Sequence, residues 1–211
     1  MDTIKRVRFV LKPIVFAVCL LPLILVFTDA FEITGRLSAN PVEDIQDRFG
    51  NWGLRFIMLG LAVTPLRQIT GKPWIGRFRR MIGLFAFFYV LLHFLVWLIL
   101  DKQLDGAAII EDIGIRPFIT IGFVATLLLL AMASTSTAAL RRRLGRTWQK
   151  IHNGAYVIGI LGVWHYWWQV KQDIREPLIY AVILTFLLGY RLWRRYGSQR
   201  PPARQLASAG S

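Results

Sequence analysis

The sequence predicts an all-α fold, a polytopic membrane protein built as a bundle of six transmembrane helices. The chain is 55% hydrophobic, with a mean hydropathy of +0.47, yet it carries a net charge of +14. Soluble domains of this size rarely combine the two properties. Apolar runs of nearly 20 residues, the length that crosses a bilayer, are separated by short basic or acidic segments. We therefore expect one transmembrane domain over 1–196 and a disordered tail over 197–211.

Six segments are apolar over about the length of a membrane span. They are Phe9–Thr28, Trp52–Ile69, Met81–Leu100, Pro117–Ser134, Ile151–Trp168 and Pro177–Trp193. Prolines open the fourth and sixth segments, where a missing backbone N–H costs nothing. Pro22 falls inside the first segment and predicts a kink there.

The first apolar run also has features of a secretory signal peptide, because Lys5, Arg6 and Arg8 precede it. Its length and the spans that follow favour an uncleaved first helix. Cys19, the one cysteine of the chain, lies in this run. The sequence therefore offers no intramolecular disulfide and no cysteine-ligated cluster.

Basic and acidic residues alternate between the connecting segments. The N-terminus, the loops 67–80 and 141–150, and the tail from Arg191 hold 19 of the 26 basic residues but only Asp2 among the 12 acids. The positive-inside rule places these segments, and hence both termini, in the cytoplasm. Charges spread between apolar runs form no basic face, so we expect no nucleic-acid partner and a membrane lipid environment instead.

The longest acidic loop, Asp29–Asn51, contains Glu43, Asp44 and Asp47. Two interpretations stay open for it. It is either a solvated loop with a short amphipathic helix from Pro41, or a docking surface for an extracytoplasmic partner.

Three histidines lie inside apolar spans and none lies in a loop: His93 is in the third span, and His152 and His165 are in the fifth. Ionisable residues inside a membrane usually have a function, and neutral imidazole commonly ligates metals and haem iron. The alternatives are hydrogen bonds between helices in a cofactor-free scaffold, or proton relay in a histidine-dependent, proton-coupled transporter without haem.

Depth along the helices suggests which histidines pair. At 1.5 Å per residue, His93 lies roughly 20 Å from Arg80, His165 roughly 28 Å from Arg146, and His152 only about 9 Å from Arg146. His93 therefore matches His165 in the outer half, and His152 lies near the cytoplasmic surface. His152 and His165 are about 20 Å apart along the axis, so they cannot ligate one iron. Arginines at the cytoplasmic span ends, among them Arg79, could neutralise haem propionates or could only set the topology.

Several stretches together resemble the MsrQ family, the haem-binding membrane subunits of periplasmic methionine-sulfoxide reductase systems in the ferric-reductase-like transmembrane group. They are NPVEDI at 40–45, TPL at 64–66, RRMIGL at 79–84, LLH at 91–93, RPFITIG at 116–122, and the run from STST at 134–137 through RRRLGRTWQKIHN to WHYWW at 164–168. Each motif alone is weak, but their order covers nearly the whole chain.

The resemblance implies a six-helix bundle of ferric-reductase-like type in the bacterial inner membrane, with b-type haem (haem b) held by histidines of spans three and five. The expected metal ligands are His93 and His165, with His152 as the less certain third. Arg79, Arg80 and Arg146 are the other expected cofactor-binding residues, and FMN is expected from the resemblance alone.

The resemblance also implies the role and the partners of the chain. It would pass electrons from the quinone pool or a cytoplasmic flavin reductase to a periplasmic, molybdopterin-containing methionine-sulfoxide reductase subunit, its partner in a heterodimer. Larger relatives carry two histidines on each of the two helices and a nicotinamide domain, whereas this chain has three histidines and no such domain. One six-coordinate haem is expected, a second would need a non-histidine ligand, and NAD(P)H is excluded as the direct donor. The chain itself would not reduce methionine sulfoxide.

Overall fold

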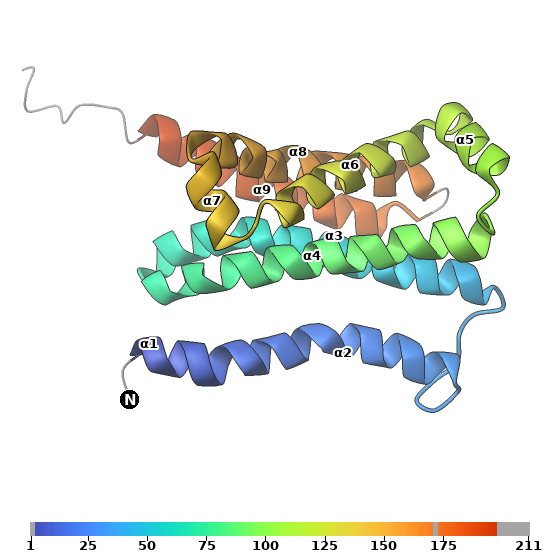
Figure 1. The fold of residues 1–211 in the computed structure, drawn as a ribbon, viewed down its shortest axis with the longest axis horizontal. Helices are drawn as coiled ribbons and strands as arrows, with labels where there is room; N and C mark the ends of the chain where they lie inside the picture. The colour runs from blue at the N-terminus through green and yellow to red at the C-terminus, as the bar shows by residue number, and fades with distance from the viewer. Residues whose placement is uncertain (1–2, 171–172, 198–211) are drawn as a thin grey trace, which may run out of the picture.

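The computed structural model describes residues 3–170 and 173–197, and this part of the chain is built from helices and short connections without strands (Figure 1). The all-α prediction is confirmed. The expected disordered tail lies, from residue 198 onward, outside the described residues.

The helices follow the predicted spans, with short additions between them. In chain order they are α1 (Thr3–Arg6), η1 (Val7–Leu11), α2 (Lys12–Ala30), α3 (Pro41–Thr70), η2 (Pro73–Phe78), α4 (Arg79–Leu95), η3 (Val96–Asp101), α5 (Gly106–Ile115), α6 (Pro117–Ser134), α7 (Ala138–Leu144), α8 (Arg146–Gln169) and α9 (Arg175–Gly197). The sequence analysis did not anticipate α5 and α7.

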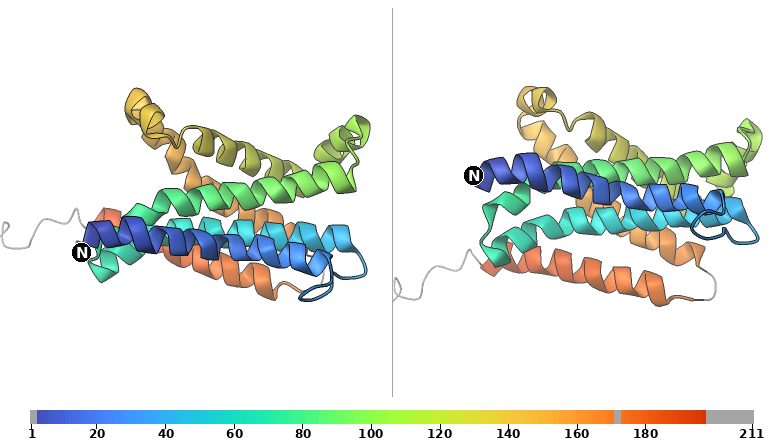
Figure 2. Two further views of the ribbon diagram at one scale, coloured as in Figure 1. Left: turned by 60° about the horizontal axis from the view of Figure 1, so that its bottom comes forward. Right: turned by 90° about the horizontal axis from the view of Figure 1, so that it is seen from below.

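The long helices lie along one common direction and form a bundle with two chemically different ends (Figures 1 and 2). At one end lie α1, η2, α7 and the end of α9, which we call the arginine-rich end. At the other lie α5 and the segment 31–40, which we call the acidic end. The most extensive helix pairs are α3 with α4 and α6 with α8.

Four helical stretches are long and apolar enough to cross a membrane: Ile4–Ala30, Pro73–Asp101, Pro117–Ser134 and Arg175–Tyr196. Within their apolar windows only 11% to 28% of the residues are buried, so most of the apolar surface faces outward. A soluble protein rarely exposes so much apolar surface, whereas lipid favours it. The other two predicted spans lie in α3 and α8, which have the length but are more polar, so the number six is not confirmed.

The helix predicted to start near Pro41 forms, but it continues into the second predicted span as one helix, α3. Asn40 caps α3, because its side chain accepts a hydrogen bond from the Glu43 N–H, and its amide donates to the Glu43 carboxylate at 2.9 Å. The pairing is reciprocal like a capping box, but the Glu43 carboxylate accepts from the side-chain amide of Asn40 and not from its backbone N–H. The loop is therefore shorter than expected, and Glu43 has a structural role in it.

An ion-pair cluster fixes the acidic-end corner between α2 and α3. Arg48 donates to Asp29 at 2.6 Å and to Asp44 at 2.8 Å. The hydrogen bond from Arg48 holds the pKa of Asp44 below its usual value. Asp44, which was expected to be available for docking, is thus engaged inside the chain.

A buried tyrosine bonds the backbone of the first long helix to the bundle. The Tyr89 hydroxyl donates to the Cys19 carbonyl at 2.7 Å and accepts from the Leu23 N–H at 3.2 Å. These two backbone groups pair directly with each other in an undisturbed helix. The Tyr89 hydroxyl therefore lies between these two groups, beside Pro22, where α2 already lacks one N–H. Tyr89 is fully buried and stacks on Phe56 with ring centres 5.3 Å apart.

Replacing Tyr89 with Phe is expected to loosen the first helix while leaving the rest of the bundle folded. The ring would keep its stacking, but the two hydrogen bonds to α2 would be lost, at about 1–2 kcal/mol of stability. Thermal unfolding in detergent, followed by helical circular dichroism, would measure the loss. Tyr190→Phe, on α9, is the matched control. An equal loss of thermal stability in both variants would contradict the role of Tyr89 in attaching the first helix.

Candidate functional site

Two of the three predicted histidines meet near the acidic end of the bundle. His93 of α4 and His165 of α8 have ring centres 6.1 Å apart and ring planes inclined at 81°. An imidazole nitrogen bonds a transition metal at about 2 Å, so two rings that bind one metal ion from opposite sides have centres about 6 Å apart. The observed separation leaves room for one metal ion between the rings.

Backbone carbonyls fix the tautomer of both rings. His93 Nδ1 lies 2.8 Å from the Gln46 carbonyl, and His165 Nδ1 lies 2.7 Å from the Phe118 carbonyl. A carbonyl oxygen can only accept, so each Nδ1 carries the hydrogen and donates it. Each Nε2 then keeps its lone pair, which is the state that binds a metal, and such a second hydrogen bond is typical of metal-binding histidines.

Glycine on the neighbouring helix lets each ring reach its carbonyl. A Cβ added at Gly50 of α3 would lie 2.9 Å from Nδ1 of His93, and one added at Gly122 of α6 would lie 2.9 Å from Nδ1 of His165. Contacts this short force the ring to move. Only glycine allows these rings to pack directly against a helix backbone.

The two halves of the site repeat one arrangement. In each half the histidine bonds a carbonyl 47 residues earlier, Gln46 for His93 and Phe118 for His165, and packs on a glycine 43 residues earlier. The pair α3–α4 therefore corresponds to the pair α6–α8. The sequence carries one sign of this repeat, a glycine 43 residues before each of the two histidines.

The histidine pair fits a metal that brings most of its own ligands. In the part of the chain that the structure describes, no group of three or more His, Cys, Asp and Glu side chains gathers as a metal site. Haem iron takes four ligands from its porphyrin and needs only two axial ligands from the protein. Two neighbouring imidazoles with unprotonated Nε2 atoms, on two helices of one bundle, can supply that set.

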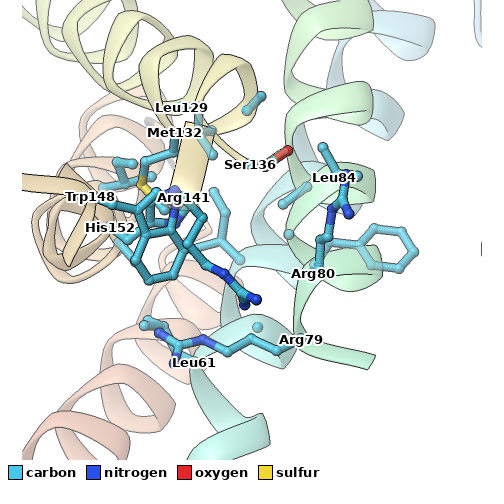
Figure 3. Close-up of a pocket in the computed structure, with 18 of the residues that line it drawn as sticks. Leu61, Arg79, Arg80, Leu84, Leu129, Met132, Ser136, Arg141, Trp148 and His152 are labelled. Carbon is cyan, nitrogen blue, oxygen red and sulfur yellow. The ribbon is translucent and has the colours of Figure 1, made fainter. Parts of the chain in front are cut away.

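A second feature lies at the arginine-rich end. A cavity of about 330 Å³ opens between α3, α4, α6 and α8 (Figure 3). Its deeper wall is apolar and includes Phe56, Leu129 and Ile158, and its polar lining includes Arg79, Arg80, Arg141, Trp148 and His152. This combination suits a planar ring with an acidic substituent.

His152 lines this cavity and lies 13 residues before His165 on α8. Its ring stacks on Trp148 with centres 4.1 Å apart, and its Nε2 lies 3.3 Å from the Thr135 hydroxyl. That hydroxyl donates to the Ala131 carbonyl at 2.7 Å, so it accepts from His152. His152 thus has its Nε2 occupied, unlike His93 and His165, and its predicted role as a ligand stays a prediction.

The predicted arginines divide between two positions. Arg79 and Arg80, at the start of α4, line the cavity. Arg146 begins α8 and is exposed, and it is not among the lining residues. Arg141 of α7 takes part instead, and the sequence analysis identified it only as part of a basic loop.

A family model described as "Ferric reductase like transmembrane component" matches residues 49–163. That range contains both glycines, His93, His152 and the cavity, and ends two residues before His165.

Curated relatives match over nearly the full length. A protein of Xanthomonas oryzae pv. oryzae (strain MAFF 311018) is 46% identical over 94% of this chain and 93% of its own length. One of Bordetella pertussis (strain Tohama I) is 46% identical over 90% of this chain and 94% of its own length. One of Xanthomonas campestris pv. campestris (strain 8004) is 50% identical over 81% of this chain and 78% of its own length. Each is named "Protein-methionine-sulfoxide reductase heme-binding subunit MsrQ".

Proposed function

The chain belongs to the MsrQ family of ferric-reductase-like membrane proteins, and from this premise we propose that it carries electrons across the bacterial inner membrane to a periplasmic methionine-sulfoxide reductase. The resemblance found in the sequence is thereby confirmed. An electron-transfer role and a multi-pass membrane location follow from the family and the apolar helices. The type of haem, the electron donor, the reductase partner and the orientation in the membrane belong to the proposal.

The observation that supports the proposal most directly is the pair His93 and His165, with ring centres 6.1 Å apart and both Nδ1 atoms bonded to carbonyls. These two residues would hold a b-type haem as its axial ligands. Bound there, haem supplies one-electron redox chemistry. The chain orients the two rings, encloses them between helices and sets the depth of the site in the membrane.

The arginine-rich cavity is the proposed place where electrons enter. Its apolar wall and its arginines would receive a quinone head group, an FMN or a docked flavin reductase, with His152 as a hydrogen-bonding residue. Phe56 lines the cavity and stacks on Tyr89, which stands one helical turn before His93 on α4. A continuous packed path thus joins the cavity to the histidine pair.

The acidic end is the proposed docking face for the molybdopterin-containing reductase subunit, with which the chain would form a heterodimer. It is the end nearer the histidine pair. Of the three acids considered for docking, Glu43 accepts a hydrogen bond from the capping residue Asn40, Asp44 pairs with Arg48, and Asp47 accepts a hydrogen bond from Gln169. Steering would therefore come from the summed charge of this end.

The proposal is tested on the purified full-length chain. We expect a red protein with the spectrum of a low-spin, bis-histidine haem, and we expect that adding the soluble reductase and methionine sulfoxide accelerates reoxidation of the chemically reduced protein. A colourless, folded and monodisperse protein would favour the cofactor-free transporter instead. Haem that stays reduced with the partner present would reject the proposed partner.

The proposed orientation places α2, α3, α4, α6, α8 and α9 across the membrane, with the arginine-rich end and both termini in the cytoplasm. The basis is the division of 19 basic residues against seven between the two sides. Reporter fusions after residues 75, 145 and 205 are expected to report the cytoplasm, and fusions after 45, 107 and 173 the periplasm. The reversed pattern, or two adjacent sites on one side, would reject the six-span topology.

A further inference from the structure

Arg191 of α9 reaches into the bundle and bonds a backbone group that a proline has released. Its Nη2 donates to the Leu61 carbonyl at 2.6 Å. In a regular helix that carbonyl accepts from the residue four positions later, which here is Pro65 and has no N–H. Arg191 therefore supplies the hydrogen bond to Leu61 that Pro65 cannot donate. This bond accounts for the Nη2 atom of Arg191.

The remaining donors of Arg191 have no such explanation. Its Nε and Nη1 are buried and have no hydrogen-bond partner among the described residues. The guanidinium lies over the ring of Tyr156, 4.8 Å from its centre, which holds its plane in place. Buried, unpaired donors on a charged group are costly unless something outside the chain satisfies them.

A second cation stands close by. Arg79, at the start of α4, lines the cavity. Leu61, whose carbonyl Arg191 holds, lines the same cavity. The ion pairs among the described residues all lie toward the acidic end, and the sequence places only Asp2 among its acids at the arginine-rich end. Two neighbouring cations thus lack a carboxylate of the chain to balance them.

We propose that Arg191 and Arg79 form a phosphate-binding site beside the cavity, at the arginine-rich end between α3, α4, α8 and α9. A phosphate monoester carries a charge of about −1.5 to −2, which balances two arginines, and its oxygens can accept from the unpaired Nη1 donor of Arg191. The phosphate belongs either to a mononucleotide ligand in the cavity or to the head group of an anionic phospholipid. The first source rests on the proposed function, in which the cavity receives a redox ligand.

The test compares four variants of the full-length chain in phosphatidylcholine nanodiscs. Arg191→Gln removes both the unpaired donors and the bond to Leu61. Arg191→Lys keeps one donor for Leu61, and Arg79→Gln touches no backbone carbonyl, so these two separate phosphate binding from folding. Arg194→Gln, at an exposed position of α9, is the matched control.

Two probes distinguish the sources of phosphate. FMN and riboflavin differ only by the phosphate group, so titrations with both measure its contribution, and phosphatidylglycerol retained after exchange from mixed vesicles measures lipid binding. If the phosphate belongs to a mononucleotide, we expect the wild type and Arg194→Gln to bind FMN at least tenfold more tightly than riboflavin. The three site variants are then expected to bind both flavins equally. If the phosphate belongs to a lipid, the site variants would retain less phosphatidylglycerol than the wild type, and their binding of FMN and riboflavin would be unchanged.

Folded site variants that keep wild-type binding of both probes would overturn the proposal, as would a wild type that neither prefers FMN nor retains phosphatidylglycerol. The low-spin haem spectrum is recorded on the same samples. Its absence from the wild type would count against the proposed function, whereas its presence with unchanged probe binding would count against the phosphate site alone.

Discussion

Replacing His93 or His165 with Ala is expected to remove the low-spin haem signal, with haem content falling at least tenfold or the remaining haem becoming high-spin. The two rings have their centres 6.1 Å apart, a separation that suits one iron, and the Nδ1 bonds leave each Nε2 with its lone pair. Loss of either ring leaves a single axial ligand, and the six-coordinate, low-spin state needs both. Optical and electron paramagnetic resonance spectra of purified variants would measure the change.

His152→Ala is the matched control, because it removes an imidazole from the same helix as His165 but at the cavity. It is expected to leave the spectrum of the histidine pair unchanged. Membrane insertion of all variants is checked by expression level and gel filtration. A native low-spin spectrum with full haem content in both the His93 and the His165 variant would show that these residues are not the ligands.

The sequence could predict the features that depend on position along one helix. The apolar runs gave the course of the long helices, and depth along spans three and five matched His93 with His165, which the structure brings together. Both arguments need only the rise per residue and the charges of the loops. The extent of the helices was less predictable, because the helix from Pro41 continues through polar residues into the second span as α3.

Features that depend on contacts between helices could not be predicted. The carbonyls of Gln46 and Phe118 hold the two histidines, but any residue type offers a carbonyl, so no sequence motif marks them. Tyr89 and Arg191 were not identified because each satisfies a backbone group near a proline on another helix. Whether an arginine faces the cavity also depends on packing, which places Arg141 on the wall and Arg146 outside it.

The glycines beneath the two rings give the most specific test of this geometry. Gly50→Ala and Gly122→Ala each add one methyl group at 2.9 Å from the ring of His93 or His165. The ring must then leave its carbonyl or tilt its Nε2 away from the partner ring. Loss of such orienting interactions around metal ligands typically costs 10- to 100-fold in metal affinity.

We therefore expect each alanine variant to lose haem at least tenfold, or to show a shifted, heterogeneous low-spin signal, although no ligand is changed. Alanine is a better helix former than glycine by about 1 kcal/mol, so the helix itself should not weaken. Gly189→Ala is the matched control, since a Cβ there meets no atom within 4 Å. Because α3 with α4 repeats the arrangement of α6 with α8, the two variants should behave alike. Normal haem content and an unchanged spectrum in both would mean that the rings do not need the close helix approach seen here, and the bis-histidine geometry derived from it would be wrong.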